Sequence, residues 1–238
     1  MSPQQASETF WRNGVVVLEH LFSEAELAPI SDEVDRVIRR EATYVPAADL
    51  IYEPGTERLR NAFRLHLYEQ KFLHFACKPQ LIAVLRAILG APLRLYGSQV
   101  FAKPPRVGTP VPRHQDMPYW PFAPDDMLSA WIALDDSTEE NGCVRFALGS
   151  HKLGRLEHAA SGVAGNSLGL VTPVELPEFA AVIRRGTCVL HHSLTVHHSE
   201  ANHSEFARRG LVYVYMGPAV ELVDPARMKG PPVFPVVT

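Results

Sequence analysis

The sequence predicts a mainly β protein with a helical buttress, and three observations lead to this fold class. Apolar residues at helical spacing dominate the first 90 positions. From Leu93 onward the pattern changes to short apolar segments that are separated by turns. The 20 prolines and 15 glycines are typical of a chain with many such turns. Helices followed by a run of short strands indicate a closed or two-sheet β architecture.

The N-terminal elements carry clear boundary signals. Gly14 is expected to end a short helix, and the apolar, β-branched run Val15–Leu18 that follows is typical of a buried strand. Ser23 and Glu26 form a capping-box pattern, which predicts the start of an amphipathic helix. The apolar face of that helix is formed by Leu27, Ile30, Val34, Val37 and Ile38.

The next stretch is predicted to contain a long loop and then two helices. Thr43–Arg60 has no periodicity, so it is interpreted as a loop. Pro79 divides two apolar, helix-like runs, and Gly90 and Pro92 end the second of them.

Seven strand-like segments fill the rest of the chain. They are Leu93–Phe101, Met127–Leu134, Cys143–Ala147, Val171–Leu176, Thr187–His192, Thr195–Ser199 and Gly210–Met216. Gly149–Gly169 is long and dotted with glycines, and the proline-rich tail from Gly217 is expected to run extended over the surface.

Composition and charge exclude several classes of protein. With 238 residues, the chain fits one domain, residues 1–238. A net charge of −3 gives no basis for binding nucleic acid or an anionic membrane surface. No apolar run approaches the roughly 20 residues that span a bilayer, and the N-terminus lacks the pattern of a secretory signal. Three widely spaced cysteines predict reduced thiols and a cytoplasmic location.

The motif His114-Gln115-Asp116 is the strongest chemical signal. In an extended chain, the side chains of His114 and Asp116 point to the same side. A second histidine would complete the two-histidine, one-carboxylate arrangement that holds non-haem Fe(II) and leaves coordination positions open. Five histidines near a predicted strand end offer that ligand, and strand alternation alone does not choose among them. They are His191, His192, His197, His198 and His203.

A cation is also needed if the open iron positions are to hold a dicarboxylate cosubstrate. Arginine suits this role because its guanidinium matches a carboxylate with two parallel hydrogen bonds. Arg208 and Arg209 both stand at the start of the last predicted strand, on opposite faces.

Four motifs in order resemble the phytanoyl-CoA dioxygenase family of Fe(II)- and 2-oxoglutarate-dependent oxygenases. The resemblance covers nearly the whole chain, from about Phe10 to Met216. The motifs are His114-Gln115-Asp116-Met117-Pro118-Tyr119-Trp120, Trp131-Ile132-Ala133-Leu134-Asp135-Asp136 with Glu140-Asn141-Gly142, Gly149-Ser150-His151-Lys152, and His197-His198-Ser199-Glu200-Ala201-Asn202 with Arg208.

The resemblance implies a double-stranded β-helix, or cupin-like jelly roll, with N-terminal and buttressing helices. It also implies that His114, Asp116 and His197 hold Fe(II), because the family's distal ligand precedes a serine by two residues and an asparagine by five. The family's cosubstrate arginine follows eleven residues later, which selects Arg208, and Ser199 resembles the serine that supports the same carboxylate.

Further site residues follow from the resemblance. Gln99 and Trp131 correspond to positions that line the cosubstrate pocket, although a tryptophan is equally typical of a core. The family also has an upstream basic residue that assists 2-oxoglutarate, for which Arg60 and Arg64 are the candidates. The carboxylate of Asp116 disfavours halogenation, because related halogenases have a small residue in its place.

The implied activity is hydroxylation of an unactivated C–H bond of a small molecule, with O2 consumed and succinate and CO2 released. Desaturation, epoxidation or cyclisation by the same machinery is the alternative within enzymes. A non-catalytic metal-binding jelly roll that binds a ligand is the alternative from another class, and Arg208 argues against it. We expect a monomer or a weak homo-oligomer.

The remaining motif residues have structural interpretations. Thr43–Arg64 and Lys152–Gly169 are the expected lid segments, being long and aperiodic. Asn141-Gly142 and Asn202 are most simply turn residues. Tyr119 and Trp120 either contact substrate or pack under a loop, and His191, His192 and His203 are expected to be structural or surface residues.

Overall fold

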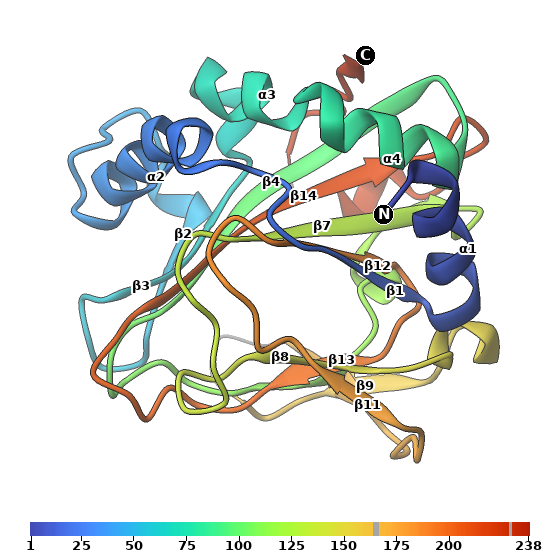
Figure 1. Ribbon diagram of the computed structural model, residues 1–238. Coiled ribbons are helices and arrows are strands. Elements are labelled where there is room, and N and C mark those ends of the chain that lie inside the picture. Colours follow the sequence, from blue (N-terminus) through green and yellow to red (C-terminus); the bar gives the residue numbers. More distant parts are fainter. Residues whose placement is uncertain (164–166, 229) are drawn as a thin grey trace.

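The computed structural model of the protein describes residues 1–163, 167–228 and 230–238. Helices gather above one large sheet, and a smaller sheet faces the large one from below (Figure 1). The α-helices are α1 (Pro3–Asn13), α2 (Glu24–Ile38), α3 (Gln70–Ala76) and α4 (Pro79–Leu89). The 3-10 helices are η1 (Ala47–Asp49), η2 (Leu65–Leu67), η3 (Met117–Tyr119), η4 (Ser150–Leu153) and η5 (Pro225–Arg227).

The large sheet has the strand order β1-β12-β7-β14-β4-β3-β2, and β16 also pairs with β4. Its strands are β1 (Val15–Leu18), β2 (Leu50–Tyr52), β3 (Leu59–Phe63), β4 (Leu93–Lys103), β7 (Met127–Ala133), β12 (Cys188–His192), β14 (Arg208–Met216) and β16 (Val236–Val237). Adjacent strands pair antiparallel.

The small sheet has the order β11-β8-β13-β5. Its strands are β5 (Val111–His114), β8 (Val144–Ala147), β11 (Glu178–Ala180) and β13 (His197–Ser199). Two short antiparallel strand pairs complete the fold, β9 (His158–Ala160) with β10 (Leu168–Leu170) and β6 (Phe122–Ala123) with β15 (Glu221–Leu222). The prediction of a mainly β chain with two sheets and a helical buttress is confirmed.

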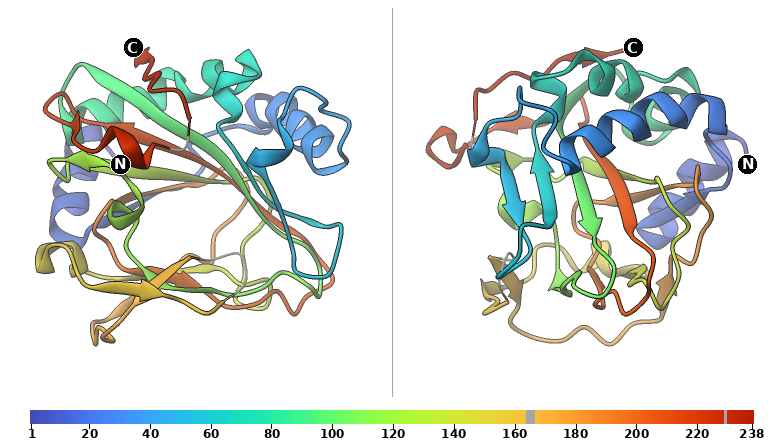
Figure 2. Two further views of the ribbon diagram at one scale, coloured as in Figure 1. Left: turned by 180° about the vertical axis from the view of Figure 1, so that it is seen from behind. Right: turned by 90° about the vertical axis from the view of Figure 1, so that its left-hand side faces the viewer.

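Strand β14 separates the helical layer from the space between the sheets. Leu211, Tyr213 and Tyr215 alternate along it and belong to the core that the helices cover. The hydroxyls of Tyr213 and Tyr215 donate to the carbonyl oxygens of Phe72 and Ala76 in α3, at 2.9 and 2.8 Å. The intervening side chains of Val212 and Val214 line the cavity on the other face of the sheet. The two turned views show the large sheet between the helices and the small sheet (Figure 2).

The N-terminal predictions agree with the structure. Gly14 ends α1 in the left-handed conformation, at φ 76°, and an added side chain there would collide with His151 and Thr195. Ser23 and Glu26 form the predicted capping box at the start of α2.

The prediction of a loop over Thr43–Arg60 is wrong. This stretch contains η1, β2 and the beginning of β3, which extend the large sheet beyond β4. Strands of three to five residues at a sheet edge carry too few alternations to be visible as a sequence period, and their pairing with β4 defines them.

Two further predictions about the C-terminal half need correction. Val171–Leu176 is irregular, because Pro173 removes a backbone donor, and the strand forms instead at β11, where it pairs with β8. The tail does not simply run over the surface: it forms β15, η5 and β16, and Leu95 donates its backbone N–H to Pro235. The segment predicted over Gly149–Gly169 forms η4, β9 and β10, while residues 164–166 lie outside the described residues.

Among the described helices, none is by itself long and apolar enough to cross a membrane. The pair α3 and α4 meets the length and composition criteria only when the two are taken together across a 58° bend. Both helices bury an apolar face in the core against the large sheet.

Two buried histidines make the fold sensitive to acid. Burial lowers the pKa of His66 and His192 from 6.5 to about 4. Between these values the unfolded chain binds more protons than the native chain, so stability falls as the pH falls. We expect each histidine to lower the free energy of unfolding by about 2 kcal/mol at pH 5 relative to pH 7, measured by urea titration. The variant His192→Gln should show a shallower pH profile, and an equally steep one would contradict this assignment.

Candidate metal centre and cosubstrate pocket

Three side chains converge between the two sheets. His114 is the last residue of β5, and His197 is the first residue of β13 and its direct partner across the strand pair. Nε2 of each histidine lies 3.7 Å from Oδ1 of Asp116, and the two imidazole centroids are 4.2 Å apart. The three ligand atoms all lie within 4.8 Å of one another, so they can hold one metal ion.

The backbone brings Asp116 to this point in an unexpected way. An extended His-x-Asp segment was the expectation, but β5 ends at His114 and Asp116 is helical, with φ −74° and ψ −38° at the start of η3. Gln115 is fully buried, and its Nε2 donates to the carbonyl oxygens of Gly154 and Leu194 at 2.8 Å each. A turn, rather than strand alternation, therefore aims the carboxylate at the two imidazoles.

Backbone carbonyls fix which nitrogen of each histidine faces the centre. Nδ1 of His114 lies 2.8 Å from the carbonyl oxygen of Pro112, and Nδ1 of His197 lies 2.9 Å from that of Thr195. A carbonyl only accepts, so Nδ1 carries the proton in both rings and the lone pair of Nε2 is left for a metal. This donor set fits iron bound by two neutral imidazoles and one carboxylate.

The second oxygen of Asp116 is held by two donors. Oγ of Ser129 and Nε2 of His191 lie 2.8 and 3.1 Å from Oδ2. Burial raises the pKa of Asp116, but its interactions with the neighbouring imidazoles, including the hydrogen bond from His191, outweigh burial and hold the pKa well below its usual range. Asp116 is therefore ionised near neutral pH. The sequence predicts that His191 is a structural or surface residue. In the structure it orients the candidate ligand Asp116, and no spacing in the sequence indicates this role.

His198 lies on the opposite face of β13 from His197. Its Nε2 is 3.1 Å from Oε1 of Glu178, and the same carboxylate pairs with Arg113. The other ring nitrogen lies 3.6 Å from Glu200. His198 is thus held in an ion-pair cluster away from His114 and Asp116, and the structure brings His197 to them instead.

Arg208 is a buried cation in the same cavity. Only 2 % of it is exposed, and Nη1 donates to the carbonyl oxygen of Gly142 at 2.9 Å. Nε is buried with no hydrogen-bond partner among the described residues. Burial lowers the pKa of Arg208 to about 10, so the guanidinium stays charged at neutral pH. A buried charge with an unused donor fits an absent anion such as the far carboxylate of 2-oxoglutarate.

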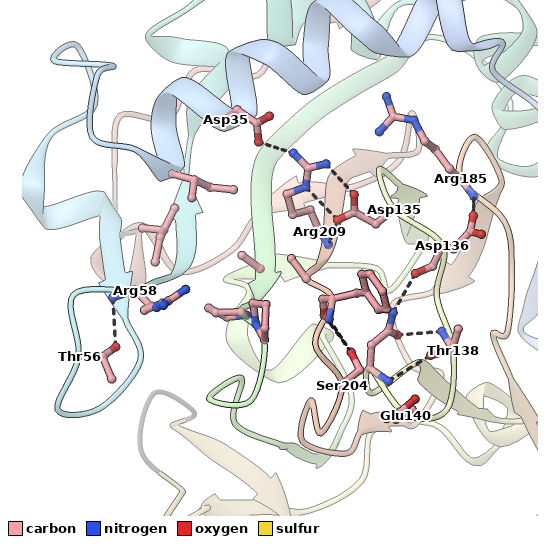
Figure 3. Close-up of a pocket in the computed structure, with 18 of the residues that line it drawn as sticks. Asp35, Thr56, Arg58, Asp135, Asp136, Thr138, Glu140, Arg185, Ser204 and Arg209 are labelled. Atoms are coloured by element: carbon pink, nitrogen blue, oxygen red, sulfur yellow. Dashed lines mark hydrogen bonds and ion pairs between the residues drawn. The ribbon is translucent and has the colours of Figure 1, made fainter.

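Arg209 faces the outside of the sheet. Its guanidinium forms ion pairs with Asp135 and Asp35, beside a surface hollow of about 1190 Å³ (Figure 3). Arg208 and Arg209 thus lie on opposite faces of the sheet, as expected.

The predicted turn residues also hold Arg208 in place. Gly142 adopts φ 76° and packs so tightly on the carbonyl oxygen of Glu200 that an added side chain would come within 2.4 Å of it. Asn141 Oδ1 accepts from the backbone N–H of Thr138 and ties this turn, whose Gly142 carbonyl binds Arg208. Asn202 Nδ2 donates to the carbonyl oxygen of Lys103, in the strand paired with Arg208. These turns therefore contribute to the site.

The remaining predicted residues line one cavity of about 510 Å³. It contains the three candidate ligands, Arg208, Ser199, Gln99 and Trp131. The Trp131 ring lies under Arg208, with the guanidinium carbon 5.4 Å from a ring centroid, and rests on Gly210, where an added side chain would come within 2.3 Å of the indole nitrogen. Trp131 is therefore both a core residue and a wall of the pocket.

Of the two upstream arginines predicted to assist 2-oxoglutarate, one lines the cavity and the other does not. Arg64 lines the cavity, whereas Arg60 is buried in an ion pair with Glu53 and does not. Asn61, next to Arg60, does line the cavity and was missed, because nothing in the sequence shows that β3 is a strand with Asn61 on its inner face.

Both expected lid segments reach the cavity. The first contributes Ile51 and Asn61, and the described part of the second contributes Ser167. Tyr119 packs edge-on against His114 and exchanges hydrogen bonds with the backbone of Leu168, at 3.1 and 3.2 Å. It thereby ties the second segment to the candidate metal centre. The tail also contributes Met228 and Phe234, which sequence analysis placed on the surface.

A jelly roll with two imidazoles and one carboxylate at a common point, and a buried arginine in the same cavity, defines the class of non-haem iron oxygenases that use a dicarboxylate cosubstrate. Residues 10–210 match the family described as "Phytanoyl-CoA dioxygenase (PhyH)", and the chain belongs to this family. It is a 2-oxoglutarate-dependent non-haem iron enzyme, and the predicted jelly-roll fold is confirmed.

The similarity to known proteins extends over most of the chain. A protein of Stutzerimonas stutzeri named "Probable alpha-ketoglutarate-dependent hypophosphite dioxygenase" is 32% identical, over 85% of this chain and 74% of its own length. The ectoine dioxygenase of Bordetella parapertussis is 29% identical, over 87% and 73%. Among solved structures, the carbocyclase SnoK from nogalamycin biosynthesis superposes with a TM-score of 0.81 and 25% identity, covering 100% of this chain and 99% of that one.

The distal ligand can be tested by comparing two adjacent histidines. We expect His197→Ala to weaken binding of Fe(II), measured anaerobically by calorimetry, by more than roughly 100-fold, because it removes a direct ligand. The matched variant His198→Ala should bind Fe(II) like the parent protein. The reverse result would assign the iron to His198, and circular dichroism serves as the control for folding.

Proposed function

We propose that this protein hydroxylates an unactivated C–H bond of a small molecule, with His114, Asp116 and His197 as the iron ligands. One observation carries the proposal: three convergent ligand atoms share a cavity with a buried guanidinium that has an unused donor. We further propose that residues 1–238 act as one oxygenase domain. A monomeric or weakly associating state and a cytoplasmic location stay predictions.

Bound iron and 2-oxoglutarate supply the oxidising power: one oxygen atom of O2 enters the succinate formed with CO2, and the other enters the substrate. The chain's own residues position the reactants. Arg208 and Ser199 hold the far carboxylate of 2-oxoglutarate, while Trp131 and Gln99 form the walls beside it. Ser129 and His191 hold Oδ2 of the Asp116 carboxylate, so that Oδ1 would be the oxygen offered to the metal.

The outcome of the reaction depends on how substrate lies relative to the metal. Named relatives act on ectoine and hypophosphite, and a solved structural neighbour is a carbocyclase. They support a small-molecule substrate and leave hydroxylation as our specific proposal. Asp116 supports oxygen transfer rather than halogenation, since its carboxylate fills the position where a halide would bind.

Turnover without substrate provides a first test. We expect slow release of succinate from 2-oxoglutarate in the presence of Fe(II), O2 and ascorbate, and none from Asp116→Ala, which loses a ligand. Succinate release by Asp116→Ala at the parent rate would remove Asp116 from the ligand set. Absence of succinate from the parent protein would favour a non-catalytic metal-binding module.

The cosubstrate cation has a matched control in its neighbour. We expect Arg208→Ala to raise the apparent KM for 2-oxoglutarate by roughly 30-fold or more, because a buried ion pair is lost. Arg209→Ala removes an outward ion-pair cluster instead and should lower thermal stability while the KM for 2-oxoglutarate stays unchanged. An unchanged KM in Arg208→Ala would show that another group holds the carboxylate.

A further inference from the structure

The cavity has a second compartment beyond the iron ligands and Arg208. Its walls come from the residue after β3, the bulged part of β4 and the C-terminal tail, including Arg64, Tyr96, Gly97, Arg227 and Phe234. The proposed mechanism assigns no task to these residues. Because the cosubstrate extends from the metal toward Arg208, this compartment is where a substrate would lie.

Open space leads from the metal centre into this compartment at Gly97. Gly97 and Ser129 are both partners of Val214 in β14, and Ser129 binds the Asp116 carboxylate. The two positions therefore lie on one row across the sheet, roughly 10 Å apart. A side chain added at Gly97 would meet no atom within 4 Å, so space is left there beside the candidate metal centre.

A β-bulge turns Tyr96 toward the same compartment. The register of β14 on β4 shifts between Val214, opposite Gly97, and Tyr215, opposite Leu95, so that Tyr96 is the extra residue. Its ring packs on Trp120, Phe122 and Phe234, with centroids 5.7, 4.8 and 6.2 Å away. Burial raises the pKa of Tyr96, and the nearby guanidinia of Arg64 and Arg227 oppose this rise. The hydroxyl is therefore protonated, and Tyr96 lines the same cavity as both arginines.

The two arginines come from different segments of the cavity wall, Arg64 from the residue after β3 and Arg227 from the tail. Arg64 is paired with the buried carboxylate of Asp49, which also accepts from the hydroxyl of Tyr68 at 2.5 Å. Arg227 comes from the tail and, among the described residues, donates one hydrogen bond, from Nη2 to the carbonyl oxygen of Pro118 at 2.6 Å. Its remaining guanidinium donors can serve a ligand.

The charges on the described cavity wall do not cancel. Three arginines, at positions 64, 208 and 227, face two carboxylates, Asp49 and Asp116. A ferrous ion and a 2-oxoglutarate dianion neutralise each other. Among the described residues of the wall, one positive charge is then left. It belongs to Arg227, an exposed residue of the wall, because Arg64 is paired with Asp49 and Arg208 is occupied by the cosubstrate.

Two donor groups of this compartment stay available to a ligand. The Tyr96 hydroxyl can donate, and the Arg227 guanidinium keeps donors beyond the one that binds Pro118. Among the described residues, the carboxylate of the compartment is Asp49, and it is already engaged by Arg64 and Tyr68.

We propose that the substrate is a small organic anion whose carboxylate or phosphonate binds between Arg64, Arg227 and the Tyr96 hydroxyl. This inference rests on the proposed function for the position of the metal. The anionic group anchors the far end of the substrate, and the reacting carbon extends over Gly97 toward the iron. Arg227 is a specificity-determining residue in this arrangement.

The test measures binding of three probes of similar shape to the holoenzyme with Fe(II) and saturating 2-oxoglutarate, under argon, by calorimetry. Benzoate and phenylphosphonate carry the anion, and benzamide is their neutral counterpart. Saturating 2-oxoglutarate keeps the probes away from Arg208. We expect at least one of the two anions to bind tenfold or more tightly than benzamide.

Variants then locate the anion. Arg227→Gln should weaken the favoured anion at least tenfold and leave benzamide unchanged. Arg86→Gln, on the exposed side of α4, removes the same charge and should change nothing. The proposal is overturned if benzamide binds as tightly as the anions, if neither anion binds, or if Arg227→Gln weakens all three probes alike, which would make Arg227 only an anchor of the tail.

These outcomes are separable from a failure of the proposed function. Probe binding requires no turnover, whereas the proposed function is tested by succinate release. Normal succinate release without a preference for anions would contradict only the proposed substrate class. A preference for anions without succinate release would contradict only the proposed oxygenase activity.

Discussion

The pairing of β13 with β5 is the constraint on which the candidate centre depends. Because His197 lies directly opposite His114, hydrogen bonding between two backbones that are 83 positions apart fixes the separation of the two imidazoles. Each ring is then locked by a carbonyl two residues before it. A shift of one residue in this pairing would replace His197 by His198, whose ring points to the other face of the sheet.

Much of this arrangement could be predicted from the sequence, and the parts that could not share a physical cause. Gly14, the capping box at Ser23 and the break at Pro79 are local signals, and they predicted the helices. The edge strands β2 and β3 depend on pairing with β4, so Thr43–Arg60 carried no signal of its own. The same reason hid Asn61, whose position on the cavity wall is set by a partner strand.

The site shows the same division between local and distant information. The motif around His114 and the spacing from His197 to Arg208 identified the residues, but the path of the chain differed from the expected one. Asp116 reaches the centre through a turn stabilised by Gln115 and by the carbonyl oxygen of Ser193, which accepts from two successive backbone N–H groups. His191 became recognisable only when folding placed its ring beside the Asp116 carboxylate.

The alternation along β14 has a consequence for how this protein can change. Outward side chains anchor the helical layer, and inward side chains face the chemistry, so an inserted or deleted residue in this strand would exchange the two sets. The bulge at Tyr96, the edge strands and the tail do not combine these two roles. Variation confined to them can redesign what the cavity accepts while the oxidising machinery stays intact, which makes this face of the molecule the natural starting point for engineering new substrates.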